Sequence, residues 1–161
     1  MNKNNYYLAV LFAVSVFLYA CSNNAPKPEA TSDGAVVEEV EETTPEIVDP
    51  MSDKGIGPIS SVDVSGEIDT AMASHGEEVF VAKCSACHKV DTRKIGPPMT
   101  GITKKRTPEW IMNMILNPEE MVQKNEAAKA LLAEYIAPMA NQNLEESEAR
   151  ALLEYFRNID K

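Results

Sequence analysis

The sequence predicts an all-α domain in the C-terminal part of the chain, and three observations support this. Apolar residues recur at helical spacing in four stretches after residue 68. Residues that commonly cap helices, such as Asp69, Thr107 and Asn125, precede three of these stretches. Alternation typical of strands is only partial and is confined to residues 51–68. The 161-residue chain is long enough for one such domain with additional segments.

The net charge of −10 is concentrated in the first half of the chain. Residues 22–75 hold twelve acidic residues and two lysines, whereas residues 76–161 are close to neutral. Neither part has the basic character expected of a protein that binds nucleic acid. The odd number of cysteines, three, argues against a disulfide framework.

Residues 1–20 are predicted to be a signal peptide. Lys3 precedes an apolar run, Leu8–Ala20, which is too short to span a bilayer because a spanning helix needs ~20 residues. The sequence Leu18–Cys21 resembles a bacterial lipobox, which implies cleavage before Cys21 and lipid modification of that cysteine. The alternatives are an ordinary signal peptide or an uncleaved anchor. The lipobox reading predicts an envelope protein held at the periplasmic side of a membrane.

Residues 21–50 are predicted to consist of the lipidated Cys21 and the flexible linker that follows it. Acidic residues and prolines dominate it and aromatic residues are absent, so it has too little apolar surface to offset the entropy of ordering. In residues 51–68, turn-forming glycines accompany partly alternating apolar residues. This segment is either an extended piece on the domain or more linker. The compact domain is expected over residues 69–161.

The first predicted helix leads into Cys84–His88, which has the pattern Cys-x-x-Cys-His. This spacing is typical of covalent attachment of a c-type haem, because two thiols on one turn can add to the two vinyl groups on one haem edge. The adjacent His88 is then placed to bind the iron. The sequence therefore predicts one covalent haem c, bound through Cys84, Cys87 and His88.

Two other readings of the cysteine pair remain open. A redox dithiol would be expected in a βαβ context, which the sequence does not show. A zinc site would need two more ligands, and only Cys21 and His75 are available. His75 could also serve as a second haem ligand, but it lies on the helix that leads into the attachment motif. We expect His75 to be a surface or partly packed residue.

Residues 89–106 are predicted to be a loop with several basic residues, which form either ordinary surface or a ring that attracts an acidic redox partner. Thr107-Pro108 begins the next helix. The sole tryptophan, Trp110, is expected to pack near the haem, with its indole N–H directed to a polar group, of which a haem propionate is one candidate.

The rest of the sequence predicts two longer helices that are separated by a polar loop. A turn or short helix over residues 118–122 is followed by a helix that Asn125 caps and that stops before Pro138. Asn143 together with Glu146 is predicted to cap the last helix.

The haem iron needs a second axial ligand, and Met139 is the favoured candidate. Met112 and Met114 are expected to face the core from within a helix, and Met99 is in a loop that must stay on the His88 side. Met139 follows Pro138 in an irregular stretch, 51 residues after His88, and that stretch can wrap to the opposite face.

Residues 69–161 resemble class I monohaem cytochromes c. Gly76 and Phe80 match the family's Gly-x-x-x-aromatic pattern before the attachment motif, and Leu152 and Tyr155 match its pattern on the last helix. The resemblance implies that these two helices cross at the glycine. It also implies that the carbonyl of Pro97 holds the imidazole of the haem ligand.

The resemblance and the motifs together predict a one-electron carrier that cycles Fe(III) and Fe(II), and not an enzyme. The expected partners are a quinol-oxidising complex as donor and a terminal reductase or oxidase as acceptor, with a membrane contact through the lipid anchor. A monomer is expected. The alternative is a haem enzyme or gas sensor with an open sixth iron position.

Overall fold

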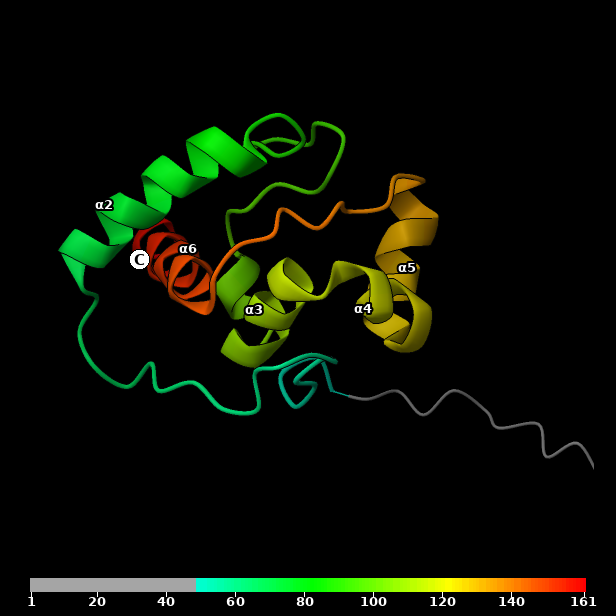
Figure 1. The fold of residues 1–161 in the computed structure, drawn as a ribbon, viewed down its shortest axis with the longest axis horizontal. Helices are drawn as coiled ribbons and strands as arrows, with labels where there is room; N and C mark the ends of the chain where they lie inside the picture. The colour runs from blue at the N-terminus through cyan, green and yellow to red at the C-terminus, as the bar shows by residue number, and fades with distance from the viewer. Residues whose placement is uncertain (1–48) are drawn as a thin grey trace, which may run out of the picture. The chain divides into compact units, whose positions relative to one another are not determined.

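The computed structural model describes residues 49–161. The predicted signal peptide, Cys21 and nearly all of the linker therefore lie outside the described residues. The described chain is built from helices, turns and irregular segments without a β-strand, which confirms the predicted all-α class (Figure 1). Its elements are α2 (Thr70–Val79), the π-helical turn η1 (Phe80–Cys84), the 3₁₀ turn η2 (Ile102–Lys104), α3 (Pro108–Leu116), α4 (Pro118–Lys124), α5 (Glu126–Tyr135) and α6 (Glu146–Ile159).

The three caps predicted from the sequence are confirmed. In each, a side-chain oxygen accepts a hydrogen bond from the backbone N–H three residues later, which satisfies a donor that the first turn leaves free. The bonds are Met72 N to Asp69 Oδ1 (2.9 Å), Trp110 N to Thr107 Oγ1 (3.1 Å) and Ala128 N to Asn125 Oδ1 (3.0 Å).

The predicted cap of the last helix is wrong. The N-cap of α6 is Glu145, and the side chain of Glu148 accepts a hydrogen bond from the Glu145 backbone N–H at 2.8 Å. Asn143 lies before the helix in a left-handed conformation with φ of 53°. A glutamate at the N-cap is uncommon, and therefore the capping preferences favoured the nearby asparagine.

Helices α2 and α6 pack across each other, and Gly76 lies at their closest approach (Figure 1). A Cβ at this position would collide with the Ala151 carbonyl group and lie 2.9 Å from Tyr155 Cβ. Next to the crossing, the ring of Phe80 packs 5.6 Å from that of Tyr155 and 6.1 Å from that of Phe156. The close helix contact thus depends on the missing side chain.

Residues 49–68 form an extended segment, here called the strap, that lies along α3 and α6 before α2 begins (Figure 1). Ile59 is buried at 6% exposure, and Ile56, Val62 and Val64 pack against the core. The strap is therefore extended and packed on the domain, which is one of the two alternatives that the sequence leaves open for residues 51–68.

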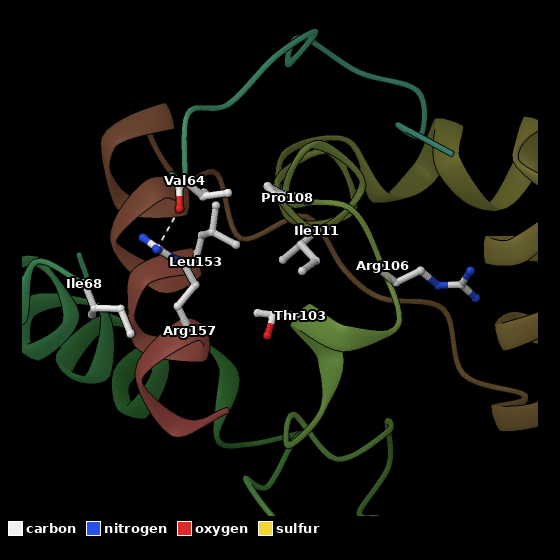
Figure 2. A pocket seen from close by; sticks show the side chains of 8 residues that line it. All are labelled: Val64, Ile68, Thr103, Arg106, Pro108, Ile111, Leu153 and Arg157. Carbon is white, nitrogen blue, oxygen red and sulfur yellow. Dashed lines mark hydrogen bonds between the residues drawn. The ribbon is translucent and has the colours of Figure 1, made fainter. Parts of the chain in front are cut away.

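Two arginines of α6 hold the last part of the strap. Arg157 donates to the Val64 carbonyl at 2.8 Å (Figure 2). It also donates to the Gly66 carbonyl at 2.8 Å and to both carboxylate oxygens of Glu154 at 2.7 and 2.9 Å, and Arg150 donates to the Asp63 carbonyl at 3.4 Å. Glu154 is almost fully buried and also pairs with Arg150. Since a buried carboxylate is costly without partners, the two arginines compensate its burial while they fasten the strap.

Candidate functional site

The Cys-x-x-Cys-His motif begins within the π-helical turn that ends α2. The Ser85 N–H donates to the Phe80 carbonyl at 2.9 Å, five residues back, and the Cys87 and His88 N–H groups both donate to the Cys84 carbonyl. A π turn rotates the following residues relative to an ordinary helix and is common at functional sites. Here it leaves Cys84 half-buried, Cys87 exposed and His88 partly buried along one cavity.

This cavity encloses about 1240 Å³ together with its open mouth. Side chains from η1, the loop after His88, α3, α4, α5, α6 and the segment between α5 and α6 line it, and most of them are apolar. It brings together all the cofactor-binding residues predicted for the domain: Cys84, Cys87, His88, Pro97, Trp110 and Met139. A large apolar cavity with a few polar groups is typical of a cofactor site.

The imidazole of His88 is oriented by the loop that follows it. Nδ1 lies 2.9 Å from the Pro97 carbonyl oxygen, which can only accept, so Nδ1 carries the proton. Nε2 then has a free lone pair, the form in which histidine binds a metal, and a backbone acceptor on the other nitrogen is the usual means of orienting it. A Cβ on Gly96 would collide with this ring, which explains the glycine before Pro97.

The two thiols do not have the character of a redox dithiol. Burial, with a smaller contribution from Cys87, raises the pKa of the Cys84 thiol to about 11. A reactive dithiol needs the opposite shift, because the thiolate is the attacking form. Residues 49–161 also contain no cluster of three or more histidine, cysteine or acidic side chains that could hold a metal ion by themselves. The raised pKa of Cys84 disfavours the dithiol reading of the motif.

Three methionines line the cavity: Met99, Met114 and Met139. Met99 lies in the loop after His88, where its N–H donates to the Lys89 carbonyl at 3.1 Å, whereas Met114 is part of α3. Met139 lies in the irregular segment 136–145 that joins α5 to α6. Met121 is fully buried elsewhere, and its sulfur accepts the Ile56 N–H.

Trp110 lines the cavity and is 3% exposed. Its indole N–H donates to Asn125 Oδ1 at 3.1 Å. The sequence left a haem propionate open as the acceptor, but the acceptor in the structure is a side chain of the protein.

Sequence reasoning missed the contacts that join the two edges of the cavity mouth. The guanidinium of Arg93 lies 4.2 Å from the centroid of the Tyr135 ring and donates to the Glu134 carbonyl at 3.3 Å. Ile136 follows directly, is 87% exposed and has a φ of 55°. A positive φ is unusual for a β-branched residue, and no local pattern in the sequence signals it.

A second cavity, of about 560 Å³ with its open mouth, lies between the strap, η2, α3 and α6 (Figure 2). No cysteine, histidine or methionine lines it, and its Arg157 is engaged by Glu154 and the strap. It is therefore a weaker candidate for a cofactor site than the cavity beside Cys84–His88.

Comparison with known proteins identifies the family. The family model for cytochrome c matches residues 73–160, which is more than half of the chain. The chain belongs to the cytochrome c family. It is 28% identical to cytochrome c-551 of Bacillus subtilis over 127 residues, which cover 75% of this chain and 85% of that protein.

Solved structures of cytochrome c from Rhodothermus marinus are also similar. One is 44% identical, with a TM-score of 0.63, and the match covers 64% of this chain and 89% of that protein. An engineered form of that protein, bound to a carbene intermediate, is 44% identical with a TM-score of 0.60 and covers 64% and 89% of the two chains. These similarities agree with a class I monohaem cytochrome c.

Cytochromes c bind one covalent haem c with its iron, and the chemistry of this cavity fits that group. Two cysteine sulfur atoms, one imidazole with a free Nε2 and the thioethers of three methionines line the same largely apolar space. Soft sulfur and imidazole are the protein ligands that haem groups of this type use.

In residues 49–161 no helix combines the length and apolar character needed to cross a membrane.

Proposed function

We propose that this cytochrome c carries single electrons between redox proteins of a bacterial envelope respiratory chain, with His88 and Met139 as axial ligands. Electron transfer is the general function of the family. Bound haem c supplies one iron that alternates between Fe(III) and Fe(II). The observation that carries the proposal is the convergence of the Cys84 and Cys87 thiols, the His88 imidazole and the Met139 thioether on one cavity.

Each of these residues has a distinct role in the proposal. Cys84 and Cys87 form thioethers that retain the haem when the iron changes its charge. His88 offers Nε2 to the iron while the Pro97 carbonyl holds Nδ1–H. Met139 fills the other axial position, where a soft thioether favours the reduced iron and raises the reduction potential relative to a second histidine. With both positions filled, none remains for a substrate.

Basic side chains surround the exposed end of the motif and suggest how a partner would approach. Lys83, Lys89, Arg93 and Lys94 are all exposed and close in sequence to the exposed Cys87. Positive charge near the site of electron exit would attract a partner with an acidic surface and speed association at low salt. Association rates that fall as salt rises would support this role.

The location and partners of the protein belong to the same proposal. The signal-like residues 1–20 and the lipobox-like Leu18–Cys21 support a lipid anchor at Cys21 and a periplasmic position. More than one acyl chain is needed for stable anchoring, and lipobox cysteines carry several. A tethered carrier would move between a quinol-oxidising donor and a terminal reductase or oxidase. Radiolabelled fatty-acid incorporation that disappears in Cys21→Ser would test the anchor.

The deciding experiment compares visible and near-infrared spectra of the wild-type protein and Met139→Ala. A low-spin wild-type spectrum with a weak sulfur-to-iron band, absent from the variant, is the expected result. Met114→Leu and Met99→Leu are matched controls, because both residues line the cavity and should leave the band in place. A band that survives in Met139→Ala would show that another residue is the ligand.

A haem enzyme or gas-binding protein is the second candidate. The engineered Rhodothermus marinus relative is described as bound to a carbene intermediate, so a related cavity admits a small molecule. In this chain the cavity also has an apolar wall formed by Val122, Leu131 and Leu132. This candidate predicts rapid binding of carbon monoxide by the reduced wild-type protein, whereas a bound Met139 predicts slow binding.

A further inference from the structure

A chain of buried hydrogen bonds runs from the strap to the wall of the haem cavity. The Asn125 Nδ2 group donates to both carboxylate oxygens of Asp53, at 3.0 and 2.8 Å. The Asn125 Oδ1 atom accepts from the Trp110 indole N–H at 3.1 Å and from the Ala128 backbone N–H at 3.0 Å. Asn125 is 8% exposed and Trp110 is 3% exposed, so water competes little for these groups.

Asp53 reinforces the orientation of the Asn125 amide. If the amide were flipped, its NH₂ group would face two N–H donors, from Trp110 and Ala128, and its oxygen would face the Asp53 carboxylate. Each contact would then join like groups, and buried donors would be left unsatisfied. The carboxylate and the two N–H donors thus favour the same orientation, and Asp53 strengthens the one in which Asn125 accepts from Trp110.

Asp53 is itself held at a defined position on the domain. Its Oδ1 accepts from the Gly55 N–H at 2.8 Å, and its carbonyl accepts from Thr107 Oγ1 at 2.6 Å. Thr107 caps α3, the helix that carries Trp110. The strap and the cavity wall are therefore joined at two points, one through the backbone of Asp53 and one through its carboxylate.

The contacts of Trp110 show what this arrangement does. Trp110 lines the cavity, whereas Asn125, the acceptor of its N–H, does not. The guanidinium of Arg106 lies 4.8 Å from the ring centroid. The indole is thus constrained at its N–H and on its ring, and its single donor is committed outside the cavity.

We infer that Asp53 is a positioning residue of the haem site, which acts through Asn125 to keep the Trp110 N–H directed away from the bound haem. This inference rests on the proposed haem function of the cavity. Asp53 immediately follows the acidic segment that is predicted to tether the protein. The point at which the tether reaches the domain is consequently linked, by two side chains, to the wall of the redox site.

The sole tryptophan makes the inference directly measurable. In the ¹⁵N-labelled, reduced holoprotein, the Trp110 indole N–H gives one resonance, whose exchange with solvent can be followed. Asp53→Ser is the main variant, because serine can still accept from the Gly55 N–H but is too short to reach Asn125. Indole exchange is expected to accelerate about five- to ten-fold, as expected for the loss of a hydrogen bond worth about 1 kcal/mol.

Two further variants separate positioning from charge and from general strap stability. Asp53→Asn removes the charge but keeps an acceptor of the right length, so indole exchange should stay close to wild type. Asn117→Ala removes a strap contact, Asn117 Nδ2 to the Ile56 carbonyl at 3.2 Å, that has no link to Trp110. This variant should lose stability without faster indole exchange.

The reduction potential provides the readout that a purely structural role would not change. Asp53→Ser should shift the potential beyond the change seen in Asp53→Asn, which accounts for the lost charge. The inference would be overturned if Asp53→Ser had the same indole exchange rate and the same reduction potential as Asp53→Asn. It would also be overturned if Asn117→Ala accelerated indole exchange as much as Asp53→Ser does. Failure of the proposed function would appear separately, as a wild-type spectrum without the sulfur-to-iron band.

Discussion

The strap side and the mouth of the haem cavity are held together in different ways. On the strap side, the partly buried Asp53 and the buried Asn113 and Asn125 bind the strap to α3 and the start of α5. At the mouth, Arg93 reaches from the loop after His88 to the end of α5 and is itself 55% exposed. Two residues after Arg93, Ile95 is exposed, and so is Ile136, which follows Tyr135 at the end of α5.

This difference places rigidity and mobility on separate parts of the cavity. Hydrogen bonds between buried groups are costly to break, because the freed groups find no water, whereas exposed ion pairs contribute little. The proposed ligand Met139 lies on the segment that begins directly after the α5 residues contacted by Arg93, whereas Trp110 lies on the buried side. We therefore expect ligand exchange to respond to changes at the mouth and global stability to respond to changes at the strap.

The largest effect is expected for Asn113→Ala. Asn113 is 1% exposed, accepts from the Ile59 N–H and donates to the carbonyls of Lys54 and Ile59, all at 2.9 Å. Its loss leaves buried groups unpaired and should cost about 3 kcal/mol of unfolding free energy in urea denaturation of the holoprotein. Asn141→Ala is the control and should change little, because it removes only exposed contacts, to the Leu116 carbonyl at 3.4 Å and from the Asn143 N–H at 2.8 Å. If Asn113→Ala and Asn141→Ala lost the same unfolding free energy, the buried strap contacts would not be the more important ones for stability.

Asp160→Asn should destabilise the protein by about 1 kcal/mol at neutral pH. Burial alone would raise the pKa of Asp160, but hydrogen bonds from the Gly101 and Thr103 N–H groups and the Thr103 hydroxyl outweigh it, so the pKa is lowered from 3.8. The carboxylate therefore stabilises the fold fully above its unfolded pKa and loses this contribution as the pH falls through the lowered folded value.

Urea denaturation of both proteins from neutral pH down to acid pH measures this dependence. The difference in unfolding free energy between wild type and Asp160→Asn should be constant above about pH 5 and should become smaller below the unfolded pKa of 3.8. If this difference in unfolding free energy grew as the pH fell, the pKa of Asp160 would not be lowered in the folded protein.

Arg93→Gln should increase the rate at which the oxidised protein binds added imidazole by about two- to five-fold, with little change in stability. The cation–π contact with Tyr135 and the bond to the Glu134 carbonyl together contribute about 0.5–1 kcal/mol at an exposed site. Stopped-flow absorbance measures the rate. The neighbouring Lys94→Gln is the matched control, because it removes the same charge but contacts only the Ser85 carbonyl among the described residues. Equal rates in the two variants would exclude a specific role for Arg93.

The smallest effect is expected for Ile136→Gly, which should raise the free energy of unfolding by about 0.5–1 kcal/mol. Ile136 ends α5 with a φ of 55° and its N–H donates to the Leu132 carbonyl at 2.8 Å, the position where glycine is favoured. Its side chain is 87% exposed, so little packing is lost. Thermal unfolding should show a higher midpoint. Asn143→Gly is the control, since asparagine already tolerates its φ of 53° and should gain less.

The attachment motif and most helix boundaries could be predicted from the sequence because they depend on neighbouring residues. The caps at Asp69, Thr107 and Asn125 each bind a backbone group three residues away, so local pattern is enough to locate them. The attachment motif is equally local, since its spacing alone indicates the chemistry. The helix crossing at Gly76 was implied by the resemblance to class I cytochromes c, and the structure places Gly76 against Ala151.

The π-helical turn and the Glu145 cap are local features that residue preferences did not reveal, and the remaining features required the folded structure. The Trp110 acceptor, the sulfur of Met121 as partner of the Ile56 N–H, and the packing of the strap join residues 15 to 72 positions apart. Hydrogen bonds over such separations form only after the helices pack, and many side chains could satisfy the same donor. The sequence by itself determined which cofactor chemistry is available, whereas tertiary packing decided which side chains hold the cavity in shape.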